Sequence, residues 1–354
     1  MKKLLCVLCM ALSLVACDKQ NNNLQHKPVI KIGAILPLTG NLATWGNSEK
    51  QGLILALENV PQKTKYKYEL VFENSENNNK NIQHIAQKLI KLDKVSAIIT
   101  MFDPAANIIG PIASENKILH FGQSWFPQYI GDKYNYNVYA DMQDESKLIT
   151  EYLKKQNLKR VYLFTVNQTG FIGGTKILKD MLKVANIDFQ ETIFNFGQTD
   201  FKIDITKAKK FKAQAYVVGA FAPESDILMK QIKQVDKENV IVTGLDLGLN
   251  ISNRAVYENS VFAAPAKPTD DFIQKYTSHF NDENYMFGAV VGYISFGTIV
   301  NAFESAESKE SVADSLFKSR ETPTVFHNKT VKDFGIIYIP SELLKISNGK
   351  LIKK

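Results

Sequence analysis

The side chain best placed to bind a small molecule is Trp45, at the end of a turn-rich loop. Residues 32–36 form a short apolar run ahead of this loop and are expected to be a β-strand. An amphipathic helix is expected to open after the loop, at Asn47 or Ser48. Loops that follow parallel strands lie at the carboxyl ends of a sheet, where ligands bind. The indole and the unpaired N–H groups of the helix N-terminus can therefore face a ligand.

Motifs of common enzyme sites are missing from the sequence. It contains no HExxH, Gly-x-Ser-x-Gly or Gly-x-Gly-x-x-Gly pattern, and residues 170–176 (GFIGGTK) fail as a phosphate loop because Thr175 separates glycine from lysine. The five histidines are widely spread, and none pairs with a cysteine at zinc-site spacing. For His120, on an expected strand, a hydrogen-bonded core position is the simpler interpretation. We expect a binding protein without enzyme activity, metal or cofactor.

Expected strands and helices, which must position such a site, alternate along the chain. Residues 95–101 form a near-continuous apolar run, as a strand in a parallel sheet covered on both faces requires. The alternation of strands and helices restarts near residues 138–143, which predicts two doubly wound α/β/α domains. Residues 285–303 carry no charge over the length of a membrane span, but their glycines and polar side chains favour a buried core helix.

The segment IGAILPLTGNLATWGNSEKQGLILALEN resembles the opening of the type I periplasmic binding proteins. Its relatives are the branched-chain amino acid and amide-binding receptors of ATP-driven (ABC) importers. The shared pattern is an apolar strand, Pro-Leu-Thr-Gly, a loop ending in aromatic-Gly, and a helix containing Gly52. The resemblance implies two lobes that close by a hinge motion on a small solute.

The resemblance also implies the division of the chain. One lobe is expected to contain residues 29–140 and 267–330, and the other residues 141–266 and 331–354. Three hinge crossovers are expected near Asp141, Ala266 and Val331.

A set of cleft residues follows from the resemblance. Trp45 stands where relatives place an aromatic ring over the ligand, Phe171 where an aromatic ring caps the site, and Asp246 where an acid pairs with an α-ammonium group. The full expected set of ligand-binding residues is Trp45, Phe102, Asp103, Ser124, Phe126, Phe171, Phe221 and Asp246. Structural roles remain open for several of them. Asp103, which precedes Pro104, suits a helix N-cap, and Phe171 and Phe221 suit a core.

The chain departs from the amino acid receptors on the carboxylate side of the site. Asp103 stands where they often have serine, and Phe126 where they have threonine. An amino acid needs donors around its carboxylate, whereas Asp103 would repel that group by up to about a few kcal/mol in a partly dry cleft. Aromatic faces stabilise cations by roughly 0.5–2 kcal/mol each. We therefore expect a small amino-acid-like, amide or amine ligand, and among these an amine or amide suits the site better; tight binding of leucine or valine would contradict this preference.

The amino-terminal residues have the pattern of a secretory signal. Two lysines precede the apolar residues 4–12, and Leu14-Val15-Ala16-Cys17 resembles the lipobox of bacterial lipoproteins. Removal of residues 1–16 would leave Cys17 as the only cysteine, lipidated and without a disulfide partner. Residues 17–28 are polar and are expected to be a tether. Asp18 suggests retention at the inner membrane. An ordinary signal beside a chance cysteine is the alternative.

Composition excludes one class of partner. The net charge of +7 falls to +5 without Lys2 and Lys3, and the lysines are scattered rather than concentrated, so we expect no nucleic-acid binding. The predicted function is a periplasmic, lipid-anchored solute receptor that serves an ABC permease in the membrane. The alternative is a ligand-sensing lipoprotein that regulates a cell-envelope enzyme or signalling partner. A neighbouring permease gene would favour the first, and a sensor kinase or cell-wall synthase gene the second.

Overall fold

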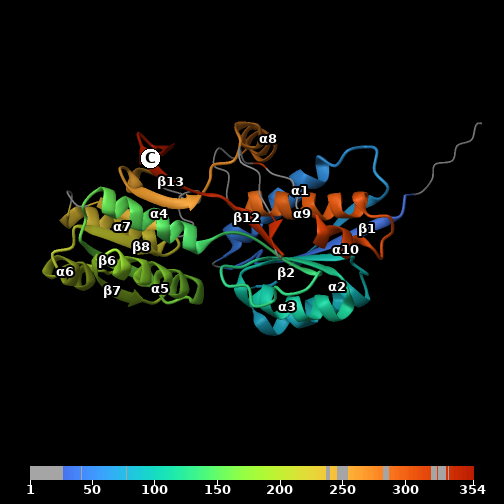
Figure 1. The fold of residues 1–354 in the computed structure, drawn as a ribbon, viewed down its shortest axis with the longest axis horizontal. Coiled ribbons are helices and arrows are strands. Elements are labelled where there is room, and N and C mark those ends of the chain that lie inside the picture. Colours follow the sequence, from blue (N-terminus) through green and yellow to red (C-terminus); the bar gives the residue numbers. More distant parts are fainter. Residues whose placement is uncertain are drawn as a thin grey trace, which may run out of the picture.

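Two α/β lobes lie side by side in the computed structural model (Figure 1). The structure describes residues 27–40, 42–76, 78–236, 240–244, 254–281, 287–319, 325, 332–333 and 335–354. Each lobe is built on one seven-stranded sheet. The predicted doubly wound α/β fold is thereby confirmed.

The first lobe has the strand order β11-β12-β5-β4-β3-β1-β2, in which all neighbours are parallel except β11 and β12. Helices α1 and α9 cover one face of this sheet, and α2 and α3 cover the other (Figure 1). Its strands are β1 (Val29–Leu36), β2 (Lys67–Asn74), β3 (Ala97–Met101), β4 (Leu119–Gln123), β5 (Asn135–Ala140), β11 (Lys332–Asp333) and β12 (Ile336–Ile339). Its helices are α1 (Ala43–Glu58), α2 (Asn79–Lys91), α3 (Asp103–Asn116), α8 (Asp270–Phe280), α9 (Phe287–Ser305) and α10 (Val312–Lys318).

The second lobe has the order β14-β13-β10-β9-β8-β6-β7, with β13 antiparallel to both of its neighbours. Its strands are β6 (Arg160–Val166), β7 (Asp188–Phe194), β8 (Ala215–Gly219), β9 (Val240–Gly244), β10 (Val261–Pro265), β13 (Ser341–Ser347) and β14 (Lys350–Lys353). Its helices are α4 (Met142–Lys155), α5 (Thr169–Val184), α6 (Lys202–Lys210), α7 (Glu224–Val235) and the 3-10 helix η1 (Arg254–Tyr257).

The central strands are apolar because both faces of each sheet are covered. Every residue of β3, β4, β5, β8 and β10 is buried, as expected of parallel strands between two helix layers. Side chains cap the amino-terminal ends of α2, α4, α5 and α8. The Asp141 carboxylate, for example, accepts from the backbone N–H of Gln143 at 2.8 Å and caps α4.

The chain passes between the two sheets three times (Figure 1). The passages lie at Asp141, between β10 and α8, and at Pro340 between β12 and β13. The third passage had been predicted near Val331, which is wrong. Strand β12 pairs in parallel with β5, with Ile336 beside Asn137. It thereby covers an edge of the first sheet that would otherwise be exposed, which keeps the chain in the first lobe until Ile339.

Helix α9 is a core helix. Among the described residues it alone is long and apolar enough to span a membrane. However, 78% of its most apolar 18-residue stretch is buried inside the molecule. It packs against α1, and Ser48 Oγ of α1 accepts a hydrogen bond from the N–H of Ala289 at 3.0 Å. Glu49 is fully buried at this contact, and burial raises the pKa of its carboxyl group. The prediction of a buried helix in this region is confirmed.

His120 on β4 is a hydrogen-bonded core residue, as predicted. Its ring is fully buried, with Nε2 2.8 Å from Thr100 Oγ1 and Nδ1 2.9 Å from Asn135 Oδ1. Burial lowers the pKa of His120 to about 4. The imidazole is therefore neutral at physiological pH and belongs to the polar interior of the first lobe.

Acidification is expected to destabilise the protein through His120. In the unfolded chain the imidazole titrates near pH 6.5, so between pH 6.5 and pH 4 the unfolded state binds a proton that the folded state excludes. This one group should cost roughly 3 kcal/mol of unfolding free energy across that interval. Urea unfolding at a series of pH values measures this. The unfolding free energy of His120→Gln should fall less steeply with decreasing pH than that of the wild type. The exposed-site variant His84→Gln should keep the wild-type slope, and equal slopes in all three proteins would contradict the prediction.

Candidate functional site

Aromatic rings from both lobes meet at the junction between them. Trp45 lies in the first turn of α1, which begins at Ala43 and not at Asn47 or Ser48 as predicted. Its ring centroid is 4.8 Å from that of Phe221, which follows β8 in the second lobe. Phe221 in turn packs edge-on against Phe171 of α5 at 4.7 Å. Trp45, Phe171 and Phe221 are all buried, so the structure brings three of the predicted site residues together.

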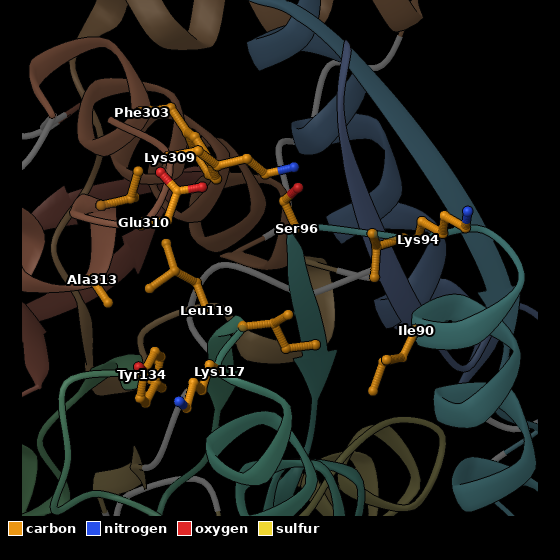
Figure 2. Close-up of a pocket in the computed structure, with 13 residues that line it drawn as sticks. Ile90, Lys94, Ser96, Lys117, Leu119, Tyr134, Phe303, Lys309, Glu310 and Ala313 are labelled. Atoms are coloured by element: carbon orange, nitrogen blue, oxygen red, sulfur yellow. The ribbon is translucent and has the colours of Figure 1, made fainter. Parts of the chain in front are cut away.

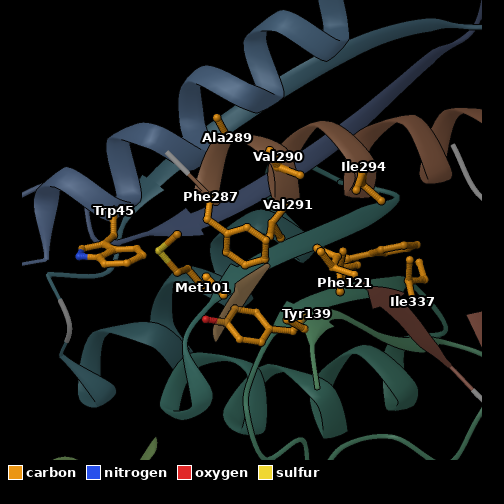
Figure 3. Close-up of a cluster of buried hydrophobic side chains, with 14 of the residues drawn as sticks. Trp45, Met101, Phe121, Tyr139, Phe287, Ala289, Val290, Val291, Ile294 and Ile337 are labelled. Carbon is orange, nitrogen blue, oxygen red and sulfur yellow. The ribbon is translucent and has the colours of Figure 1, made fainter. Parts of the chain in front are cut away.

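Trp125 extends this group from the loop after β4. Its ring lies 4.9 Å from Phe171, 6.2 Å from Phe221 and 6.0 Å from Tyr139. Tyr139 continues to Phe287 of α9 at 5.3 Å, and Figure 3 shows Trp45, Met101, Tyr139 and Phe287 close together in the first lobe. We call the six aromatic residues the junction cluster; they are Trp45, Trp125, Tyr139, Phe171, Phe221 and Phe287.

Half of the junction cluster was missing from the predicted site. Trp125, Tyr139 and Phe287 join it only through contacts made in the folded chain. For Trp125 there was a signal, because its two sequence neighbours, Ser124 and Phe126, were both in the predicted set. Tyr139 and Phe287 had none, because each lies in an apolar segment that looks like ordinary core.

Two glycines allow the lobes to approach at this junction. A Cβ atom on Gly170 would lie 1.8 Å from Trp125 Cε3, and one on Gly173 would lie 2.4 Å from Phe126 Cε2. Both glycines are in the first turns of α5, which begins at Thr169. The glycine-rich segment that fails as a phosphate loop therefore provides a flat helix surface for the rings of the opposite lobe. Phe171 lies on the same helix.

Asp103 holds the loop after β4. Its Oδ1 accepts hydrogen bonds from Ser124 Oγ at 2.5 Å and from the backbone N–H of Phe126 at 2.9 Å. The N-cap of α3 is Phe102, which makes no side-chain cap, so the N-cap interpretation of Asp103 is wrong. Phe102 has φ of +69°, a strained conformation of a kind that gathers at binding sites and costs about 1–3 kcal/mol.

The same loop is fixed a second time from β5. The Asn137 amide accepts from the N–H of Ser124 at 2.9 Å and donates to its carbonyl at 3.0 Å. Tyr129 Oη also donates to Asn137 Oδ1 at 2.7 Å. Trp125 and Phe126 therefore project from a loop whose backbone is held rigidly.

A buried donor and a buried acceptor at the end of β4 lack partners among the described residues. They are the indole Nε1 of Trp125 and the amide Oε1 of Gln123. Burying such a group without a hydrogen bond costs about 1–3 kcal/mol. Both groups can therefore contribute to holding a polar ligand.

Two predicted functional residues, Asp246 and Cys17, lie outside the described residues. The described part of the chain contains no group of three or more His, Cys, Asp or Glu side chains able to hold a metal ion. The chemistry that the described junction offers is aromatic contact together with a few amide, indole and carboxylate groups.

Comparisons with known proteins agree with this architecture. A family model described as periplasmic binding protein matches residues 29–332. The Leu/Ile/Val-binding protein homolog 3 of Brucella melitensis is 21% identical over 345 residues, which cover 91% of this chain and 93% of that protein.

Solved structures share the fold. A leucine binding protein from Thermotoga maritima has a TM-score of 0.79 at 21% identity, covering 92% of this chain and 97% of that one. A branched-chain amino acid transporter substrate-binding protein from Streptococcus pneumoniae, solved with isoleucine, also has a TM-score of 0.79 at 21% identity, covering 92% of this chain and 100% of that one.

Proposed function

This chain belongs to the periplasmic binding protein family, and from that premise we propose that it is the extracytoplasmic solute receptor of an ABC importer. The observation that supports this most directly is the contact between Trp45 and Phe221, which joins the two lobes through aromatic side chains at 4.8 Å. A receptor of this kind closes because the ligand adds contacts to both lobes. The junction cluster is suited to that role because the first lobe supplies four of its rings and the second lobe supplies two, Phe171 and Phe221.

The ligand, we propose, is a small amine or amide without a carboxylate. The hydroxyl of Ser124 and the N–H of Phe126 are donors of the kind that receive a carboxylate, and both already bind Asp103 Oδ1. A ligand carboxylate would lose these donors and meet a like charge, which is unfavourable in a partly dry site.

Other groups at the junction suit an amide. The N–H of Trp125 can donate to an amide carbonyl, and the Oε1 of Gln123 can accept from an amide N–H. The aromatic faces favour an amine in its cationic form. Asp246 is proposed as the acceptor for that charge from the second lobe.

Replacing Asp103 is expected to change which ligands bind. In Asp103→Ser the acidic group is removed and the donors at residues 124 and 126 become free. Carboxylate-bearing amino acids should then bind roughly tenfold or more tightly than they do to the wild-type protein, because a released charge-assisted hydrogen bond is worth about 1.5–3 kcal/mol. Calorimetry with matched pairs such as leucine and leucinamide measures the change.

Two outcomes would contradict the ligand assignment. One is tight binding of leucine or valine by the wild-type protein, and the other is an unchanged preference in Asp103→Ser. Asp144→Ser, which removes an exposed carboxylate from α4 of the second lobe, serves as the matched control. Mass spectrometry of the small molecule that co-purifies with the wild-type protein identifies the ligand itself.

We also propose that the mature chain begins with a lipidated Cys17 and is held at the periplasmic side of the membrane beside its permease. The support is the lipobox-like sequence and the polar segment 17–28 that follows it. Incorporation of labelled palmitate in cells tests this. Labelling that persists in Cys17→Ser would exclude Cys17 as the lipid site.

A further inference from the structure

The first lobe has a pocket at the end of its sheet away from the junction. Its volume is about 600 Å³. Residues just ahead of three parallel strands line it, namely Ser96 before β3, Ile118 before β4 and Tyr134 before β5. Figure 2 shows Ser96 and Tyr134 at the pocket. The junction residues Asp103 and Trp125 follow the carboxyl ends of β3 and β4. The pocket is therefore separated from the junction by the length of the strands.

The pocket combines an apolar wall with a basic rim. The wall is formed by side chains from strands and helices, including Val95, Leu119, Phe303, Val312 and Ala313, all of which are buried. Three lysines, Lys94, Lys117 and Lys309, face a single acid, Glu310. Figure 2 shows the three lysines on three different sides of the pocket.

These lysines are not engaged in ion pairs with any residue that the structure describes. Other lysines of the same lobe are paired, such as Lys133 with Asp314 at 2.8 Å and Lys88 with Glu73. An apolar cavity of this size with a few polar groups at its mouth is the usual form of a small-molecule site. Unpaired ammonium groups there favour an anionic group on the ligand.

The ends of two helices explain part of this pattern but not all of it. Lys117 is the C-cap of α3, and Lys94 follows the end of α2, where a cation is favoured by the helix dipole. Lys309 lies between α9 and α10 and reaches the pocket from another side. The dipoles of α2 and α3 give no reason for its position.

We propose that this pocket binds a small amphipathic anion, consisting of one phosphate or carboxylate group on a short hydrocarbon body. Such a molecule could be a soluble metabolite or a membrane lipid. The start of β1 lies at the same end of the lobe, since the N–H of Ser96 donates to the carbonyl of Lys31 at 2.8 Å. A lipid anchor attached through the amino-terminal segment would keep this end of the lobe close to a membrane.

Calorimetry on the intact protein with hexyl phosphate tests the proposal. We expect one hexyl phosphate per chain, with inorganic phosphate and hexanol binding at least about tenfold more weakly because each lacks half of the required chemistry. The double variant Lys117→Glu/Lys309→Glu should weaken hexyl phosphate binding by about tenfold or more. Lys155→Glu, which changes an exposed lysine at the end of α4 in the other lobe, should bind as the wild type does.

Two further measurements distinguish a lipid from a soluble ligand and this pocket from the junction. Dihexanoyl phosphatidylglycerol that binds more tightly than hexyl phosphate would identify a lipid, and weaker binding would identify a soluble anion. Trp45→Leu should leave hexyl phosphate binding unchanged, which separates this pocket from the receptor function of the junction. No binding of hexyl phosphate, equal binding of inorganic phosphate, or an unaffected double variant would overturn the proposal.

Discussion

Replacing Gly170 with alanine is expected to hold the two lobes apart and to weaken ligand binding by roughly tenfold or more. The added Cβ would lie 1.8 Å from Cε3 and 2.2 Å from Cζ3 of Trp125. The indole cannot easily move aside, because it lies against Phe171 at 4.9 Å and Tyr139 at 6.0 Å. Overpacking of this kind costs about 1–3 kcal/mol, and here the molecule can avoid that cost by opening.

Gly170→Ala should impair closure without unfolding the protein. Alanine is more favourable than glycine in a helix by about 1 kcal/mol, so the substitution does not weaken α5 itself. Small-angle scattering should report a larger radius of gyration for Gly170→Ala, and calorimetry with the co-purified ligand should report the lower affinity. Lys176→Ala, on the exposed face of α5, is the matched control.

A second substitution tests the cause of the opening. Trp125→Ala in the Gly170→Ala background removes the ring that the new methyl group meets, so the compact form should return. An unchanged scattering profile and an unchanged affinity in Gly170→Ala would show that this contact does not limit closure.

Replacing Gly52 with alanine is expected to be among the most destabilising single changes in the chain, at about 3 kcal/mol or more. A Cβ atom there would lie 1.9 Å from the carbonyl oxygen of Ala289 and 2.5 Å from its carbon. Backbone atoms of a helix cannot rotate away as a side chain can. The α1–α9 contact is also close further along, because a Cβ atom on Gly292 would lie only 2.5 Å from the carbonyl oxygen of Glu49. Widening it would therefore affect much of its length.

Urea unfolding measures this loss. Gly52→Ala should unfold at a much lower urea concentration than the wild type, because widening the contact would also break the hydrogen bond between Ser48 and Ala289. Thr44→Ala, at an exposed position in the first turn of the same helix, should change the stability by no more than about 0.5 kcal/mol. A value for Gly52→Ala as small as that of the control would mean that the two helices tolerate a wider separation.

Much of the fold was predictable because its signals are local. Buried parallel strands appear as unbroken apolar runs, as in β3, and the opening segment around Trp45 carried the pattern of the family. The beginning of α1 was predicted several residues too late. Its first turn contains Thr44 and Gly46, which interrupt the apolar periodicity on which the prediction relied.

Signals carried by residues close together in the chain were therefore enough to predict the alternation of strands and helices, the two α/β units and the family. Three features became visible only in the folded chain: Trp45 contacts Phe221, Asp103 binds Ser124 and Phe126, and the last passage lies at Pro340. Such contacts depend on how whole sheets and lobes are placed in space. Residues far apart in the chain become neighbours there, and no local periodicity records which of them will touch.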